Sequence, residues 1–317
     1  MDQVSLLVII PVHDFSEQQK AVHQEGFSPY VAGGSAKEAN KLIRELVACV
    51  RNFEPTANIV LHVDAAFTAF NVEEQPLDGL YVCNERLRTA YGGSHLGTIC
   101  AAYRYAIRRR IQHDSVILMT SSEMPIRSGL AAHVKGKRAA FWPNLAMPNT
   151  VKFAAGVLER HRLFHLSSFL QRPVVYHSQI EGCYFSASVF RQIVDTLGEA
   201  YDHQALNDPP MYLEELLIPT IAATLIDHQH GDVLPEPVTL FYVGRGHVTM
   251  EEQDLDYIVG NLKSGFRVGR CWGPNNPQFV GAYQRADSVF SVKRVERRRD
   301  DPVRLRILEA SRGGSLW

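Results

Sequence analysis

Four short apolar runs, each bounded by polar turn residues, constrain the fold of this 317-residue chain more than any other feature. Continuous runs rich in Val, Ile and Leu are typical of strands that are buried on both faces of a parallel sheet. The runs are Ser5–Val12, Asn58–Val63, Gly79–Val82 and Ser115–Thr120. We therefore expect four neighbouring strands in the first half of the chain.

Helical patterns fill two of the gaps between these runs. Ala36–Arg51 and Ser94–Arg110 both carry apolar residues at helical spacing. The resulting alternation predicts an α/β fold with a doubly wound, mostly parallel, Rossmann-like sheet, whose ligand lies beyond the carboxyl ends of the strands. Polar residues follow three of these ends: His13 and Asp14, then Asp64, then Thr120 to Glu123.

The second half of the chain is less regular. We expect strands at Gly182–Ser186 and Val238–Val243, and helices at Ala187–Leu197 and Leu213–Ile226. No linker is long enough to divide the chain, and no internal repeat occurs. A single large domain is therefore predicted, followed by a charged segment near the C-terminus.

Composition excludes several classes of protein. There are 33 Lys and Arg against 34 Asp and Glu, so no global basic field would hold nucleic acid. The apolar run Leu6–Val12 is far shorter than the roughly 20 residues that span a bilayer, and Asp2 replaces the basic start of a signal peptide. Five cysteines without a C-x-x-C pair favour neither a disulfide framework nor a zinc knuckle. We expect a cytoplasmic protein without a transmembrane segment.

Several motifs are missing. No glycine follows Val12 before Gly26, so the G-x-G-x-x-G signature of dinucleotide enzymes is absent, as are the P-loop and the G-x-S-x-G nucleophile elbow. The cluster Asp227–Asp232 has ligand-type side chains, but its spacing matches no standard zinc motif. Asp254-Leu255-Asp256 reads as a metal-holding D-x-D, yet it leads into a helical pattern rather than following a strand. We therefore predict no metal site.

Several segments share an order along the chain that matches one family. They are Leu61–Asp64, Tyr91–Ser94, Met124–Ser128, Gly182–Phe185, and Glu214-Glu215 with Thr220. These resemble the I-H-V-D, W-G-G-x-S, D-[FY]-P-I-K-[ST], G-S-x-[WY] and D-E-x(4)-T elements of the core-2 β-1,6-N-acetylglucosaminyltransferase and peptide O-xylosyltransferase family. Its members are inverting glycosyltransferases of the GT-A fold that work without a metal ion. The resemblance spans roughly residues 8 to 270.

The resemblance implies that fixed cations stabilise the leaving diphosphate, because no metal ion does so. The family uses one Arg and one Lys for this purpose. Arg245 matches the family's arginine, nine residues before the Asp254-Leu255 pair. The segment that should carry the lysine has none, and either Arg267 or Arg270 could substitute, because a guanidinium also grips phosphate oxygens.

Glu215 matches the family's catalytic base by its distance to Thr220. An inverting transfer is a single displacement at the anomeric carbon, so one base suffices to take the acceptor's proton. Glu214 competes for this role, because adjacent helical residues point about 100° apart and only one can face a cleft. Both could also simply favour the helix start.

The family's nucleotide contacts fall on Val12, His13, Asp14, Asp64 and Tyr91. A carboxylate at a strand end, such as Asp64, can accept from ribose hydroxyls or the uracil N–H, although it could also cap the following turn. The family has a basic residue where this chain has Ala66, so one contact is missing. The acceptor-binding residues, expected in the Pro143–Arg172 stretch, do not align.

The resemblance therefore implies a GT-A glycosyltransferase domain over residues 1–290, with a nucleotide-binding half (1–130), an acceptor and catalytic half (131–290) and a charged tail (291–317). The donor would be a UDP-sugar carrying GlcNAc, xylose or glucose, the acceptor a carbohydrate or other hydroxyl, and no cofactor is expected. The basic tail could be a solvated helix or contact a membrane surface or partner. The alternatives are a metal-dependent transferase using Glu123 or the Asp254 pair, and an inactive relative that binds carbohydrate or a partner.

Overall fold

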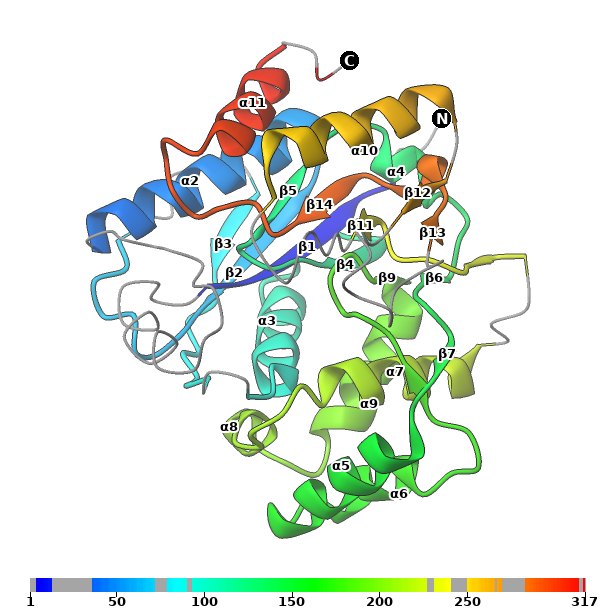
Figure 1. The fold of residues 1–317 in the computed structure, drawn as a ribbon. Helices are drawn as coiled ribbons and strands as arrows, with labels where there is room; N and C mark the ends of the chain where they lie inside the picture. Colours follow the sequence, from blue (N-terminus) through cyan, green and yellow to red (C-terminus); the bar gives the residue numbers. More distant parts are fainter. Residues whose placement is uncertain are drawn as a thin grey trace.

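A computed structural model describes residues 4–12, 36–71, 79–89, 93–226, 231–240, 250–265, 267–269, 283–313 and 316. Its centre is a sheet of seven strands in the order β10-β6-β9-β4-β1-β2-β3 (Figure 1). The strands are β1 (Leu6–Val12), β2 (Asn58–Val63), β3 (Leu80–Val82), β4 (Ser115–Leu118), β6 (Ala139–Ala140), β9 (Tyr184–Ser186) and β10 (Val233–Leu234). β9 runs antiparallel to β4 and β6, and the other pairs are parallel. The prediction of an α/β fold with a mostly parallel Rossmann-like sheet is therefore confirmed.

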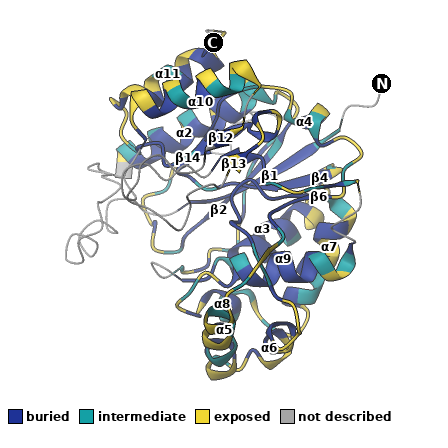
Figure 2. Cartoon of the chain, turned by 45° about the vertical axis from the view of Figure 1, so that its right-hand side comes forward, coloured by how far each residue is buried: buried dark blue, intermediate teal, exposed yellow. Residues whose placement is uncertain are grey.

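Helices cover both faces of this sheet, because side chains along the central strand alternate between two apolar clusters. Leu6, Val8 and Ile10 of β1 pack in one cluster, and Leu7 and Ile9 pack in the other. One face carries α2 (Ala36–Phe53), α10 (Glu252–Ser264) and α11 (Pro302–Ser311), and the other carries α3 (Leu96–Arg108), α7 (Ala187–Gly198) and α9 (Glu214–Leu225). Figure 2 shows the sheet buried between these two layers.

Smaller elements complete the described fold. A three-stranded sheet has the order β11-β14-β5, and two ribbons pair β12 with β13 and β7 with β8. Their bounds are β5 (Glu123–Pro125), β7 (Asn144–Leu145), β8 (Tyr176–His177), β11 (Thr239–Leu240), β12 (Val268–Gly269), β13 (Tyr283–Gln284) and β14 (Ser291–Lys293). The remaining helices are α4 (Leu130–His133), α5 (Pro148–Arg160), α6 (Phe164–Leu170), α8 (His203–Asn207) and the 3-10 turn η2 (Ala286–Ser288).

The charged C-terminal segment is packed against the domain, which differs from the expectation of a solvated helix. Arg304 of α11 is 2% exposed, and its guanidinium donates to the Glu45 carboxylate at 3.2 Å and to the Leu42 carbonyl at 2.9 Å. Asp301 caps α11 by accepting from the Arg304 backbone N–H at 2.8 Å. The segment therefore contributes to the layer of α2. The domain division at residues 130 and 290 stays a prediction.

Candidate functional site

Carboxylates converge at the edge of the sheet where β1, β2 and β4 have their carboxyl ends. Asp64 follows β2, and its backbone N–H donates to the Val12 carbonyl at 2.8 Å. Glu123 follows β4, and Glu181 precedes the antiparallel strand β9. Open α/β sheets bind their ligands at this edge. Of the residues predicted for the site, Val12 and Asp64 thus lie side by side.

Asp64 holds its own turn in place. Its two carboxylate oxygens accept from the backbone N–H groups of Ala66 at 2.7 Å and Thr89 at 2.8 Å. The side chain is buried, which these hydrogen bonds compensate. The turn-capping alternative is thus seen in the structure, while a contact between Asp64 and a nucleotide stays a prediction. Val12 is 1% exposed, so its side chain belongs to the core and only its backbone could meet a ligand.

Glu215 lies in the first turn of α9 with a side chain that is 27% exposed. Its Oε2 lies 3.1 Å from Nε2 of His177 on β8. When the carboxylate is ionised, that nitrogen must carry a hydrogen and donate. Glu215 therefore combines an oriented carboxylate with access to solvent.

Glu214, its neighbour, has a different environment. It is 1% exposed, and its Oε2 accepts from the His95 backbone N–H just before α3 at 3.1 Å. Burial raises the pKa of Glu214 to about 8, with smaller contributions from Glu215 and Glu181. Glu214 thus ties α9 to the start of α3 and is closed to a bulky acceptor. The two side chains do point apart, as the helix geometry requires.

Thr220, five residues after Glu215 on α9, helps to hold β8 against this helix. Its hydroxyl oxygen accepts from the Tyr176 backbone N–H at 2.9 Å, and the Glu215 carbonyl accepts from the Ser178 N–H at 2.9 Å. These two bonds fix β8 along α9, and the intervening His177 thereby meets the Glu215 carboxylate. The sequence analysis did not single out His177, because its 38-residue separation from Glu215 is bridged only by tertiary packing.

A second cluster surrounds Glu123, which is 0% exposed. Its carboxylate accepts from the Thr120 N–H at 2.5 Å and from the Thr239 hydroxyl at 2.8 Å. Burial is the main cause that raises the pKa of Glu123, and the charge of nearby Glu181 adds to it. Lys293 is the register partner of Glu123 across β5 and β14 and forms an ion pair with Glu181. Sequence reasoning missed Glu181 and Lys293, since no local pattern links them.

The described residues contain no group of three or more His, Cys, Asp or Glu side chains arranged to hold a metal ion. The Asp254 pair has other partners, as its position in the sequence suggested. The Asp254 carboxylate accepts from the Glu251 backbone N–H at 2.9 Å in a capping box at the start of α10. Asp256 forms an ion pair with Arg306 at 2.6 Å.

The remaining predicted site residues have no described contact with Glu215, Asp64 or Glu123. Arg267 is exposed in the segment between α10 and β12. His13, Asp14, Tyr91, Arg245 and Arg270 lie outside the described residues, as does most of the Asp227–Asp232 cluster.

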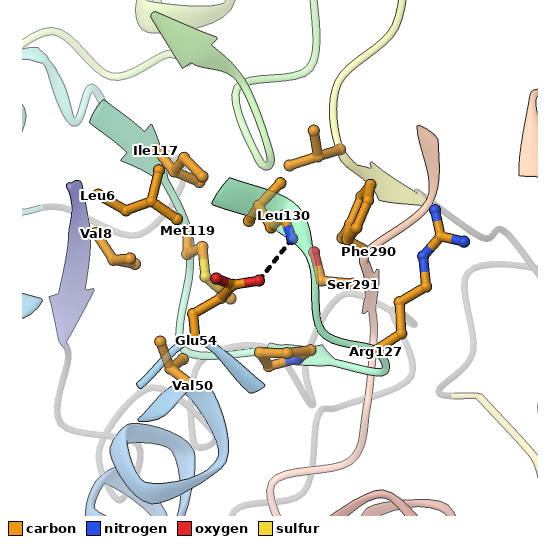
Figure 3. A pocket seen from close by; sticks show the side chains of 12 residues that line it. Leu6, Val8, Val50, Glu54, Ile117, Met119, Arg127, Leu130, Phe290 and Ser291 are labelled. Atoms are coloured by element: carbon orange, nitrogen blue, oxygen red, sulfur yellow. Dashed lines mark hydrogen bonds between the residues drawn. The ribbon is translucent and has the colours of Figure 1, made fainter. Parts of the chain in front are cut away.

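Two cavities lie away from the carboxylates. One is an enclosed space of about 20 Å³ between β1, β4 and α2, lined mostly by apolar side chains such as Leu6, Val8 and Met119 (Figure 3). Glu54 borders it and accepts from the Leu130 N–H at 2.6 Å. Such a volume holds about one water molecule. The other, a groove of about 540 Å³, lies between the end of α3 and the start of α7. Neither contains a predicted site residue.

No family model and no curated protein matches the chain. Two of the similar solved structures are a nucleoside-diphosphate-sugar pyrophosphorylase from Vibrio cholerae RC9 and the galactosyltransferase LgtC in complex with donor and acceptor sugar analogs. The first is 9% identical over 69% of this chain and 88% of that chain, with a TM-score of 0.37. LgtC is 9% identical over 97% of this chain and 95% of that chain, with a TM-score of 0.37. At these values neither similarity decides the fold or the function.

Proposed function

We propose that the protein is an inverting glycosyltransferase that uses a UDP-sugar without a metal ion. The donor carries GlcNAc, xylose or glucose, and the acceptor is a carbohydrate or other hydroxyl compound. The proposal rests on the resemblance to the core-2 and xylosyltransferase family. The observation that carries it is Glu215, an accessible carboxylate held by His177 and near Cys183, which directly precedes β9 and is also near Glu123 and Glu181.

In the proposed reaction the acceptor oxygen attacks the anomeric carbon while the bond from that carbon to the phosphate oxygen breaks. The acceptor's proton passes to Glu215, and the electron pair of the broken bond leaves with UDP. His177 donates to the ionised carboxylate and keeps it oriented toward the acceptor. Arg245 and either Arg267 or Arg270 stabilise the charge that develops on the diphosphate.

The nucleotide part of the donor is assigned to the first half of the chain. Val12, His13, Asp14, Asp64 and Tyr91 would surround the uracil and ribose. Support comes from the carboxyl edge itself, where Asp64 and Val12 are hydrogen-bonded neighbours. The Asp64 oxygens accept from the backbone N–H groups of Ala66 and Thr89, and in the proposal this carboxylate also meets a ribose hydroxyl or the uracil N–H.

The proposal is tested by measuring UDP release from the three UDP-sugars with and without EDTA. Glu215→Gln is expected to lower kcat by roughly 10²- to 10⁴-fold, because it removes the proton acceptor. The variant should keep the rise in melting temperature that UDP, but not ADP or NAD, produces in the wild type. Glu252→Gln, a similar change in the exposed first turn of α10, serves as the control.

Three outcomes would contradict the proposal. Unchanged activity in Glu215→Gln would show that Glu215 is not the base. The absence of any thermal shift by uridine compounds would argue against a UDP-sugar donor. Activity that EDTA abolishes and magnesium restores would favour the metal-dependent alternative.

A further inference from the structure

The ribbon of β7 and β8 presents apolar side chains to solvent on one face. Leu145 is the register partner of Tyr176, and the Ala146 N–H donates to the Val175 carbonyl at 2.9 Å. This register places Met147 opposite Val174. Side chains that are two apart on a strand, or directly opposite on its partner, share a face. Leu145 and Met147, each 71% exposed, and Val174, 43% exposed, therefore lie on the same side.

The adjoining helices α5 and α6 add two aromatic side chains to the exposed surface. Phe153 is 59% exposed and Phe164 is 63% exposed, while the opposite sides of both helices are buried in the core. Among the described residues, nine large apolar side chains are exposed, and five of them fall between residues 145 and 174. We call these five, Leu145, Met147, Phe153, Phe164 and Val174, the 145–174 surface. Figure 2 shows exposed residues along α5.

The same part of the chain is strongly basic. From Met124 to Ile180 the sequence has eight Lys and Arg residues and one acidic residue, Glu159, and four of the eight (Arg127, Lys135, Lys137 and Arg138) precede β7. The whole chain has a net charge of −1, so the rest is acidic by a similar margin. Four of the basic side chains are exposed on or beside α5 and α6: Lys152, Arg160, Arg162 and Arg172. Exposed aromatic and aliphatic side chains thus share this stretch of sequence with exposed cations.

We infer that the 145–174 surface docks on an anionic lipid bilayer. Segments that lie in the membrane interface combine Phe and Leu, which enter the acyl boundary, with Lys and Arg, which meet the anionic headgroups. None of the described helices is both long and apolar enough to cross a membrane, so the contact is peripheral. A second copy of the chain fits less well, because a symmetric dimer would place this positive charge against itself.

The docking surface and the candidate site share one strand. β8 carries His177, which bonds to Glu215, and Tyr176, which pairs with Leu145. Docking would therefore bring the candidate base close to the bilayer surface. The inference concerns binding and does not depend on the proposed transfer reaction.

The test is flotation of the full chain with two kinds of vesicle, phosphatidylcholine alone and phosphatidylcholine mixed with phosphatidylglycerol. We expect the protein to float with the anionic vesicles and less so as salt rises, because salt screens the basic side chains. The double variant Leu145→Ser/Met147→Ser should bind at least about tenfold more weakly, because it removes apolar area that enters the bilayer. Lys152→Glu/Arg172→Glu should show a similar loss.

Matched controls lie elsewhere on the surface. Leu305→Ser removes a side chain that is 50% exposed on α11, and Lys263→Glu reverses an exposed charge at the end of α10. Both should float like the wild type, and all variants should keep its melting temperature. The inference is overturned if the wild type does not float with anionic vesicles. It is also overturned if Leu145→Ser/Met147→Ser floats as well as the wild type. A concentration-dependent dimer that forms without lipid and is lost in that variant would assign the surface to a second copy instead.

Discussion

Glu214 and Glu215 are neighbours in the sequence with opposite environments. Glu214 is buried and bonded to a backbone N–H, whereas Glu215 reaches solvent and bonds to His177. The sequence predicted that one of the pair would serve as the base and favoured Glu215 from the spacing to Thr220. It could not show which one is buried, because that depends on α3, whose first turn lies about 120 residues earlier.

The raised pKa of Glu214 predicts a pH-dependent contribution to stability. Its folded pKa of about 8 lies above the usual 4.5, so the folded state holds this proton more tightly than the unfolded state. The contribution is present in full below pH 4.5 and is lost as pH rises to about 8. Glu214→Gln, which mimics the protonated form, should therefore gain stability relative to the wild type across this window, by about 1–3 kcal/mol.

Thermal unfolding of both proteins at pH 5, 7 and 8.5 would measure this gain, with Glu215→Gln, whose side chain is partly exposed, as the comparison. A difference between wild type and Glu214→Gln that stays constant with pH would show that Glu214 ionises freely.

Gly182 is a second position where one residue decides the local structure. Its φ is +72°, and a Cβ there would lie 2.3 Å from the backbone nitrogen of Thr239. Gly136 has nearly the same φ, +73°, but nothing within 4 Å of its Cβ position. Gly136→Ala should lower the free energy of unfolding by about 1–2 kcal/mol through the left-handed conformation alone. Gly182→Ala should lower it clearly more because of the clash with Thr239. Chemical denaturation would compare them, and equal costs would contradict the clash.

At the scale of elements, the apolar runs located the main strands well. Asn58–Val63 matches β2 at both ends, and Ser5–Val12 differs from β1 by one residue. The helices α2, α3, α7 and α9 were also predicted to within about two residues. These elements are buried, so the spacing of their apolar residues reflects both their burial and their secondary structure, which makes them readable from the sequence.

The elements that the sequence missed include short strands that depend on distant partners. β5 and β14 are three residues each and pair with strands far along the chain. The antiparallel direction of β9 was also not predictable, because an apolar run carries no sign of direction. α5 and α6 fall in a stretch that was treated as a variable acceptor region, and their exposed aromatic residues weaken the amphipathic pattern.

The contact between α9 and β8 gives a prediction at this scale. Thr220→Val removes the hydroxyl that accepts from the Tyr176 N–H at 2.9 Å, at a cost of about 0.5–1.5 kcal/mol. It should also lower kcat of the proposed transfer, because β8 carries His177. Thr224→Val in the same helix removes only a local bond to Ile221 and is the control. Equal effects on kcat from both variants would show that β8 does not depend on Thr220.

At the scale of the whole molecule, α11 closes over α2 through Arg304. Arg304→Ala would remove a buried guanidinium that bonds to the Glu45 carboxylate, which keeps its ion pair with Arg299 at 2.7 Å, and is expected to cost about 1.5–3 kcal/mol. Arg306→Ala breaks a more exposed pair with Asp256 and should cost less than about 1 kcal/mol. Denaturant unfolding of the two variants measures the difference, and similar costs would mean that the Arg304 side chain contributes no more to stability than an exposed pair does.

The ion pair between Glu45 and Arg304 joins residues that are 259 positions apart in the chain. Closing so long a loop has a large entropic cost that must be met before the contact stabilises anything. During refolding, the face of α2 that meets α11 should thus stay open until most other parts are ordered. A partly folded species with this face uncovered would be the one most prone to aggregate, and the one that a chaperone would need to protect.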